Sequence, residues 1–222
     1  MDLRNWKGVP RPDRVTLDGS YARLEPLDPV RHGPDLLASA SQPGAEDRFR
    51  YLPDEPPADR AAMLAWLEKA AGSADPLFFA VIDRETGRAE GRQALMRIVP
   101  EHGVIEIGNI LWGPAIARTR VVTEALYLFA GYVFDTLGYR RFEWKCNNLN
   151  EPSKRAAQRF GFTFEGVFRQ HMVVKGQNRD SAWFAMTDGD WARLKPGYEA
   201  WLSPENFGPD KQQKSRLAGD YA

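Results

Sequence analysis

The alternation of polar and apolar side chains predicts strands through the middle of the chain. Residues 141–146 place Phe142, Trp144 and Cys146 on one face and Glu143 and Lys145 on the other, which is the two-residue period of a half-buried strand. Apolar runs bounded by Gly, Pro and Asp predict the remaining strands. These lie at about 21–27, 77–82, 89–99, 104–112, 162–175 and 178–187.

Apolar residues at helical spacing predict the elements between these strands. The longest stripe recurs every three or four residues and predicts a helix over about 119–137, followed by Gly138 as its natural end. Four prolines predict that 41–57 is a loop with at most one helical turn. Shorter helices are expected at 28–40, 58–71, 151–160 and 190–201.

The order of the elements predicts an α/β (α+β) fold. Hairpins on both sides of one central β-α-β crossover indicate a mixed, mostly antiparallel sheet of about six to seven strands with helices on both faces. We expect an irregular N-terminal arm at 1–20, a single domain at 21–202 and a polar C-terminal tail at 203–222.

Composition argues against several classes of function. The 222 residues include 30 basic and 30 acidic side chains, so the net charge of zero speaks against a dedicated nucleic-acid or membrane-surface protein. One Cys and three His speak against a disulfide framework and a metal centre. With no long apolar run and a polar beginning that lacks the apolar region of a secretory signal, we expect a cytoplasmic protein.

The turn after the predicted strand 104–112 is a candidate phosphate site. It leads into a helix N-terminus, where free backbone N–H groups and the helix dipole favour an anion. Arg118 and Arg120 would add two charges beside those groups. The alternative is that both arginines are simply solvated, because the usual glycine-rich nucleotide fingerprints are absent.

A slot beside this strand is a second expectation. Gly108-Asn109 interrupts an apolar run and predicts a bulge that would part the strand from its parallel neighbour. The helix start at 147–153 belongs to the same edge of the sheet, where open α/β sheets bind ligands. Asn150 is expected to cap this helix, and Ser153 is free to face the slot.

The segment from Tyr21 to Trp191 resembles the GNAT superfamily of acyl-CoA N-acyltransferases, in the branch similar to the RimJ/RimL N-terminal acetyltransferases. The resemblance rests on the text EIGNILWGP and on an N-x-x-S…GF-x-x-EG spacing further on. The residues of that spacing are Asn150, Ser153, Gly161, Phe162, Glu165 and Gly166.

The resemblance implies that acetyl-CoA is a co-substrate held between strands 104–112 and 141–146, with no metal. It implies that Asn150 contacts the pantetheine arm and that Ser153 lies near the thioester sulfur, where an acid protonates the leaving thiolate. The amine would enter over 28–57 and the 162–187 hairpin. The other implied CoA contacts are Ile110, Leu111 and Trp112 for pantetheine, Ala117, Arg118, Thr119, Arg120, Val121 and Val122 for pyrophosphate, and Arg155 near the 3′-phosphate.

The chain departs from the family pattern at two places. Arg120 and Val122 stand where the family's pyrophosphate loop usually has Gly and Gly or Ala. Ala157 stands where many members have a Tyr that acts as the acid. Ser153 or water must then supply the proton, or none is needed, because a thiolate with a pKa near about 8.5 leaves fairly well.

Three residues are candidates for the general base that takes a proton from the amine. His171 titrates near neutral pH, and Glu106 could act through water. Glu165 is the third, although its pair with Gly166 would also shape a strand. We interpret Cys146 as a core residue and expect His32 and His102 to be solvated.

The sequence therefore predicts an N-acetyltransferase that transfers an acetyl group directly from acetyl-CoA to a primary amine, as a monomer or homodimer. The alternative is a non-catalytic acyl-CoA-binding module. A nucleic-acid-binding domain is a third possibility, indicated only by arginine clusters at 118–120, 140–141 and 154–159. We expect positive charge where CoA phosphates bind, and acidic side chains (Glu106, Glu143, Glu165) where the amine approaches.

Overall fold

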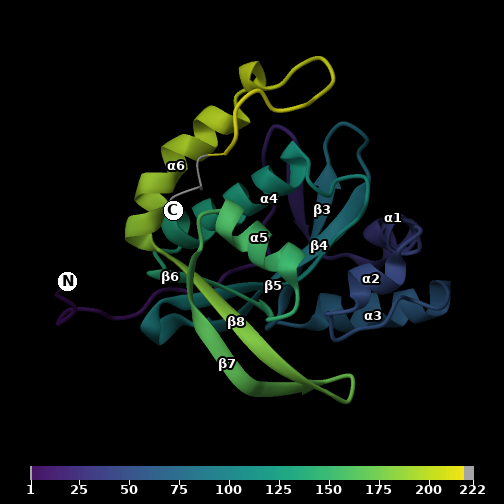
Figure 1. Cartoon of the computed structure of the whole chain (residues 1–222), viewed down its shortest axis with the longest axis horizontal. Helices are drawn as coiled ribbons and strands as arrows, with labels where there is room; N and C mark the ends of the chain where they lie inside the picture. Colours follow the sequence, from purple (N-terminus) through teal and green to yellow (C-terminus); the bar gives the residue numbers. More distant parts are fainter. Residues whose placement is uncertain (1, 218–222) are drawn as a thin grey trace.

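The computed structural model describes residues 2–217, whose strands form one mixed sheet (Figure 1). The sheet has eight strands in the order β1-β2-β3-β4-β5-β6-β8-β7, against the six to seven predicted. Only β5 and β6 are parallel, as the single predicted crossover requires. The strands are β1 (Leu17–Asp18), β2 (Ala22–Pro26), β3 (Leu77–Asp83), β4 (Ala89–Val99), β5 (Val104–Trp112), β6 (Arg141–Asn147), β7 (Thr163–Val174) and β8 (Gln177–Thr187).

Helices cover both faces of the sheet, as expected. The first and third pack on the face that bears Phe78, Ala80 and Ala94, and the second packs through Phe49 against Leu111. The last three pack on the opposite face around Phe79, Phe129 and Phe142. In Figure 1 the two groups lie on different sides of the central strands. The helices are α1 (Pro29–Ala40), α2 (Ala45–Phe49), α3 (Arg60–Gly72), α4 (Arg120–Gly131), α5 (Glu151–Arg159) and α6 (Asp188–Leu202).

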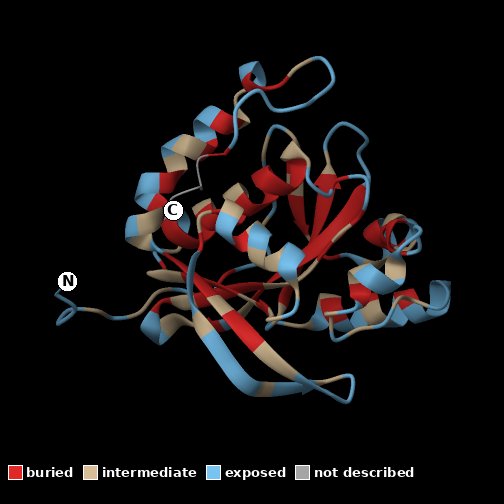
Figure 2. Ribbon diagram, viewed as in Figure 1, coloured by how far each residue is buried: buried red, intermediate tan, exposed pale blue. Residues whose placement is uncertain are grey.

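Burial is concentrated in the central strands and in α4, while the β7–β8 hairpin extends away from the body with an exposed tip (Figure 2). Aromatic pairs fill the core below α4; the Phe79 and Phe129 rings meet edge to face at 5.1 Å. Such contacts add to the stability that buried apolar area already gives. Among residues 2–217, no helix combines the length and apolar composition needed to cross a bilayer.

The crossover helix is shorter than predicted as an α-helix. Its α-helical part ends at Gly131, and a π-helical segment, η2 (Tyr132–Thr136), completes it. Tyr132, Val133 and Phe134 are all buried within that segment. The π-helical turn thus belongs to the buried part of the crossover, like the α-helical residues before it.

The structure differs from the sequence analysis at the edges of the domain. β1 lies within the expected arm, and Phe207 and Leu217 of the expected tail pack into the main core. Residues 218–222 of that tail lie outside the described residues. His32 was expected to be solvated, and this is wrong: it is buried in α1, where its Nε2 lies 3.1 Å from Oε2 of Glu25.

Candidate active site

A bulge in β5 parts this strand from β6. Asn109 and Ile110 stand opposite Gln93 of β4 alone, and Asn109 has a φ of 50°. Pairing between β5 and β6 stops at Ile107, so the β5 main chain over 108–112 has no β6 partner. Both the predicted bulge and the predicted splay of the parallel pair are confirmed.

A cavity of about 260 Å³ lies where the two strands part. Five of the predicted site residues line it: Glu106, Ile110, Asn150, Ser153 and His171. Residues from β4 to β8 and from the α2 region therefore meet at the carboxyl end of the parallel pair, the edge at which open α/β sheets bind ligands.

Ser153 is held in the first turn of α5. Its backbone N–H donates to the capping Asn150 side chain at 3.2 Å, and the indole N–H of Trp144 donates to its Oγ at 3.0 Å. The indole has no acceptor atom, so this contact uses a lone pair of the hydroxyl rather than its proton. The Cys146 sulfur is a second hydrogen-bond partner of the Ser153 side chain. This arrangement matches the role of an acid.

Cys146 also lines the cavity but does not have the character of a nucleophile. The thiol is 5% exposed, and burial raises its pKa. A thiol with a raised pKa stays protonated at neutral pH, and the thiolate is the reactive form. The structure therefore agrees with the interpretation of Cys146 as a core residue.

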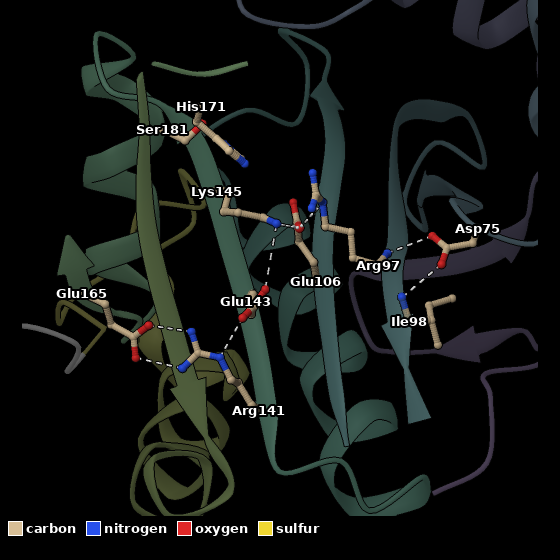
Figure 3. A network of polar contacts seen from close by, with 10 residues as sticks. All are labelled: Asp75, Arg97, Ile98, Glu106, Arg141, Glu143, Lys145, Glu165, His171 and Ser181. Atoms are coloured by element: carbon tan, nitrogen blue, oxygen red, sulfur yellow. Dashed lines mark hydrogen bonds and ion pairs between the residues drawn. The ribbon is translucent and has the colours of Figure 1, made fainter. Parts of the chain in front are cut away.

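Glu106 is buried at the centre of a charged group (Figure 3). Its Oε2 lies 2.5 Å from Nζ of Lys145 and 3.4 Å from Nε of Arg97. Burial raises the pKa of Glu106, and the attraction of Lys145 opposes that rise. Burial likewise lowers the pKa of Lys145. Both groups are thus shifted toward neutral pH, as groups that exchange protons in active sites often are.

Arg97 reaches this group from an irregular end of β4. It has a left-handed φ of 47°, and the pairing between β4 and β5 shifts register at the same place. The Asp75 carboxylate accepts hydrogen bonds from the backbone N–H groups of Arg97 at 2.8 Å and Ile98 at 3.0 Å (Figure 3). These bonds hold the backbone in a conformation that costs a non-glycine residue about 1 kcal/mol.

His171 projects from β7, and in Figure 3 its ring points toward the group formed by Lys145, Glu106 and Arg97. Its Nδ1 lies 2.9 Å from Oγ of Ser181 on β8. Burial lowers the pKa of His171, and Arg97, Lys145 and Arg179 lower it further. The imidazole is therefore neutral at pH 7 and is a weaker base than an unperturbed histidine.

Glu165 and Glu143 are not brought to the cavity. Glu165 forms a two-pronged ion pair with Arg141, with contacts of 2.8 Å and 2.5 Å, and this hydrogen bonding lowers its pKa. Glu143 accepts a hydrogen bond from the same arginine at 2.7 Å. Neither lines the 260 Å³ cavity, so of the three glutamates expected on the amine side only Glu106 lies there.

A second cavity, of about 520 Å³, lies between the start of α4, α5 and the C-terminal segment. It is positive as predicted: five basic residues line it, and no acidic residue is among its lining in the described part of the chain. The predicted residues at this cavity are Trp112, Ala117, Arg118, Arg120, Val122 and Arg155, joined by Arg159 and Lys211.

The turn into α4 has its special backbone conformation at a position other than the two where the family has glycine. The residue with a left-handed backbone is Arg118, with a φ of 63°, rather than Arg120. Thr119 caps the helix by accepting a hydrogen bond from the Val121 N–H at 3.2 Å, and the Val121 side chain is buried. The guanidinium of Arg120 lies 4.2 Å from the centre of the Tyr21 ring and is held there by a cation–π contact.

Leu111, a predicted pantetheine neighbour, lines a third cavity of about 400 Å³ beside α1 and α3. There the buried Arg92 pairs with Asp54 at 2.6 Å, and its guanidinium lies 3.9 Å from the centre of the Trp66 ring. The lining is otherwise largely apolar. This cavity lies next to the active site without containing its proton-transfer groups.

Lys145, Arg97 and Arg179 were not among the predicted site residues. The alternation puts Lys145 on the face opposite the core side chains of its strand, together with Glu143, and gives it no role. Its side chain is 4% exposed, because β5 and the terminal hairpin cover it. Arg97 and Arg179 reach the cavity through a register shift and a hairpin, which no local sequence pattern indicates.

The mixed eight-stranded sheet, splayed at one parallel pair beside a positive cavity at a helix N-terminus, defines an acyl-CoA acyltransferase architecture. Residues 23–163 match the acetyltransferase (GNAT) domain, so the chain belongs to the GNAT N-acetyltransferase family. The assignment to this family from sequence is confirmed.

Solved structures and one curated protein are similar to the chain. A GCN5-related N-acetyltransferase from Brucella melitensis is 59% identical, with a TM-score of 0.95 and 97% of both chains covered. A probable acetyltransferase of the GNAT family from Chromobacterium violaceum is 38% identical, with a TM-score of 0.79 over 86% of this chain and 96% of that one. An uncharacterised N-acetyltransferase, p20, from Bacillus licheniformis is 30% identical over 118 residues, which are 51% of this chain and 64% of that protein.

Two further structures share the fold at low identity. One, from Salmonella typhimurium, is described as modifying the N-terminal serine of ribosomal protein L7/L12; it is 16% identical, with a TM-score of 0.65 over 78% of this chain and 99% of that one. The other is the microcin C7 self-immunity acetyltransferase in complex with acetyl-CoA and AMP; it is 18% identical, with a TM-score of 0.66 over 76% and 93%.

Proposed function

We propose that the chain transfers the acetyl group of acetyl-CoA to a primary amine, either a protein N-terminus or a small molecule, by direct attack on the thioester. The pair of cavities at the parted ends of β5 and β6 is the observation that supports this most. The larger one has a basic lining that matches the phosphates of CoA. The smaller one combines a hydroxyl with a buried carboxylate, which matches proton transfer at a reacting thioester.

The proposed reaction uses residues of the smaller cavity. The amine nitrogen attacks the thioester carbonyl, the C–S bond breaks, and the Ser153 hydroxyl or solvent protonates the thiolate. Main-chain N–H groups of β5 beyond the bulge have no β6 partner and are candidates to polarise the carbonyl. A direct transfer needs no enzyme nucleophile, in agreement with the protonated state of Cys146.

Among the three candidate bases, we propose Glu106. Its pKa is raised, so it accepts a proton more readily than an ordinary glutamate, whereas the pKa of His171 is lowered. Glu165 is engaged by Arg141 outside the cavity. The neighbouring cations help as well, because positive charge lowers the pKa of a bound amine and favours its reactive free-base form.

Calorimetric titration of acetyl-CoA, followed by an assay of thiol release with a panel of amines, tests the proposal. We expect acetyl-CoA to bind, to bind more weakly when its 3′-phosphate is removed, and to release thiol only when an amine is added. Absence of acetyl-CoA binding would contradict the proposal. Binding without thiol release for any amine would instead support an acyl-CoA-binding module, for which the missing loop glycines and the Ala157 position speak.

A further inference from the structure

We propose that the acceptor of this acetyl transfer carries an anionic group close to its amine, and that Arg179 binds this group. The inference rests on the proposed function and adds the chemical class of the acceptor. An amino acid or an amine bearing a phosphate belongs to this class, whereas a polyamine or an aminoglycoside does not.

The first observation is the excess of positive charge around the small cavity. Arg97, Lys145 and Arg179 line it together with a single carboxylate, Glu106, among the described residues. Glu106 is already in contact with Lys145 and Arg97. It therefore has little capacity to attract a cationic substrate, and a polycation would meet like charge on several sides.

The second observation concerns Arg179 itself. Its side chain lines the cavity from β8, its Nε is buried without a hydrogen-bond partner, and no carboxylate forms an ion pair with it within residues 2–217. Arg179 is half-buried, so its guanidinium is partly withdrawn from water, and a bound anion would compensate for this. Its planar array of donors fits a carboxylate or a phosphate.

The third observation is the position of Arg179 at a junction. The small cavity adjoins a wider groove of about 800 Å³, and Tyr51, Asn147, Val174 and Arg179 line both. An acceptor anchored at Arg179 can thus extend its amine inward, toward Glu106 and Ser153, while the rest of the molecule lies in the groove. The groove has basic and acidic residues in equal number, so it adds no strong preference of its own.

The same charges explain how a basic amine could react in such a site. The cations disfavour a bound ammonium and shift the amine toward its free base, while the anionic group offsets the cost of entering a positive cavity. Arg179 is then a residue that positions the substrate rather than one that moves a proton. Its loss should raise KM far more than it lowers kcat.

Matched acceptors test this inference. L-alanine, L-leucine and L-phenylalanine are compared with their amides, O-phosphoethanolamine with ethanolamine, and spermidine serves as a polycation. We expect the anionic member of at least one pair to exceed its partner by about tenfold or more in kcat/KM, the effect of one charge-assisted contact. Comparison of the amino-acid pairs with the phosphoethanolamine pair shows whether the site prefers a carboxylate or a phosphate.

Variants then assign the preference to one residue. Arg179→Gln should abolish it through KM with kcat nearly unchanged, Arg179→Lys should retain part of it, and Arg169→Gln, an exposed arginine on β7, should change nothing. The inference would be overturned if the wild type acetylated the amides, ethanolamine or spermidine with the same kcat/KM as the anionic acceptors. It would also be overturned if Arg179→Gln kept the wild-type preference for the anionic acceptors. If no panel member is acetylated, the same pairs are titrated into the CoA-bound protein, and equal or absent binding of the acids overturns it too. Acetyl-CoA binding and thiol release with any other amine report on the proposed function separately.

Discussion

The ammonium of Lys145 and the carboxylate of Glu106 form an ion pair of 2.5 Å between the two parallel strands, with both side chains almost fully buried. The strands are in register at Ile107 and Trp144, so the pair forms at the last point where they are joined. The pair thus lies between the hydrogen-bonded part of the sheet and the open slot, where the proposed reaction places its proton acceptor.

Replacing Lys145 by Met should both destabilise the protein and shift its pH profile. Removal of Lys145 leaves the buried carboxylate with only its longer contact to Arg97, and breaking a buried ion pair costs roughly 3–5 kcal/mol in unfolding free energy. Loss of the attraction also raises the pKa of Glu106 further. Chemical denaturation measures the first effect, and Lys69→Met, an exposed lysine on α3, is the matched control. An unfolding free energy equal to that of the control would contradict this prediction.

The pH dependence of kcat/KM should report Glu106. A base works only when ionised, and burial raises the pKa of Glu106. Activity should therefore fall, as the pH is lowered, at a higher pH than an ordinary glutamate would give. Lys145→Met should move this acid limb upward, and Glu106→Gln should remove the limb and lower turnover by about 10²-fold or more. A limb that persists in Glu106→Gln but vanishes in His171→Gln would identify His171 as the base.

Ser153→Ala should lower turnover about 10-fold to 100-fold with little change in acetyl-CoA affinity. The effect lies near or below the low end for general acids, because a thiolate is a fair leaving group. Ser41→Ala, the same substitution at an exposed serine, is the control for effects of the substitution that do not depend on the site. Since Ser153 also accepts the Trp144 indole N–H, the thermal stability of both variants is measured alongside. Unchanged turnover would remove Ser153 from the mechanism.

Arg118→Gly should separate the binding of CoA from backbone strain. Glycine relieves the left-handed conformation, so stability should hold or rise by about 1 kcal/mol. Loss of a guanidinium at the phosphate cavity should weaken acetyl-CoA binding about tenfold. Gln170→Gly is the matched control, because Gln170 also has a positive φ, of 52°, but does not line the 520 Å³ cavity. Equal acetyl-CoA affinity in the two variants would argue against a phosphate contact.

Asp54→Asn should destabilise the protein by about 3 kcal/mol, because it leaves Arg92 buried without its carboxylate. Asp47→Asn makes the same chemical change in the exposed pair with Arg50, where a surface ion pair is worth about 0–1 kcal/mol. The two denaturation curves form a direct comparison. Equal midpoints would show that water replaces Asp54 at Arg92.

Local patterns were sufficient for most of the fold. The alternation at 141–146 and the apolar stripe in α4 predicted the type of each element, although both are buried on more than the apolar face. Gly108-Asn109 marks the bulge because few residues tolerate that backbone. The site was only partly predictable. Ser153 and Glu106 could be found because they stand on recognisable elements. Arg179 could not, because its place depends on how the β7–β8 hairpin lies against β6, a long-range contact with no local signature.

The segment after α6 determines when, during synthesis of the chain, the 520 Å³ cavity can form. Lys211, Gln212 and Gln213 line the cavity whose opposite wall begins at Trp112. About one hundred residues separate these walls in the order of synthesis. A nascent chain on the ribosome can therefore complete the sheet, the bulge and α4 while the cavity is still open on one side. The 520 Å³ cavity becomes whole only when the segment that bears Phe207 and Lys211 has emerged and Phe207 has packed against Tyr21.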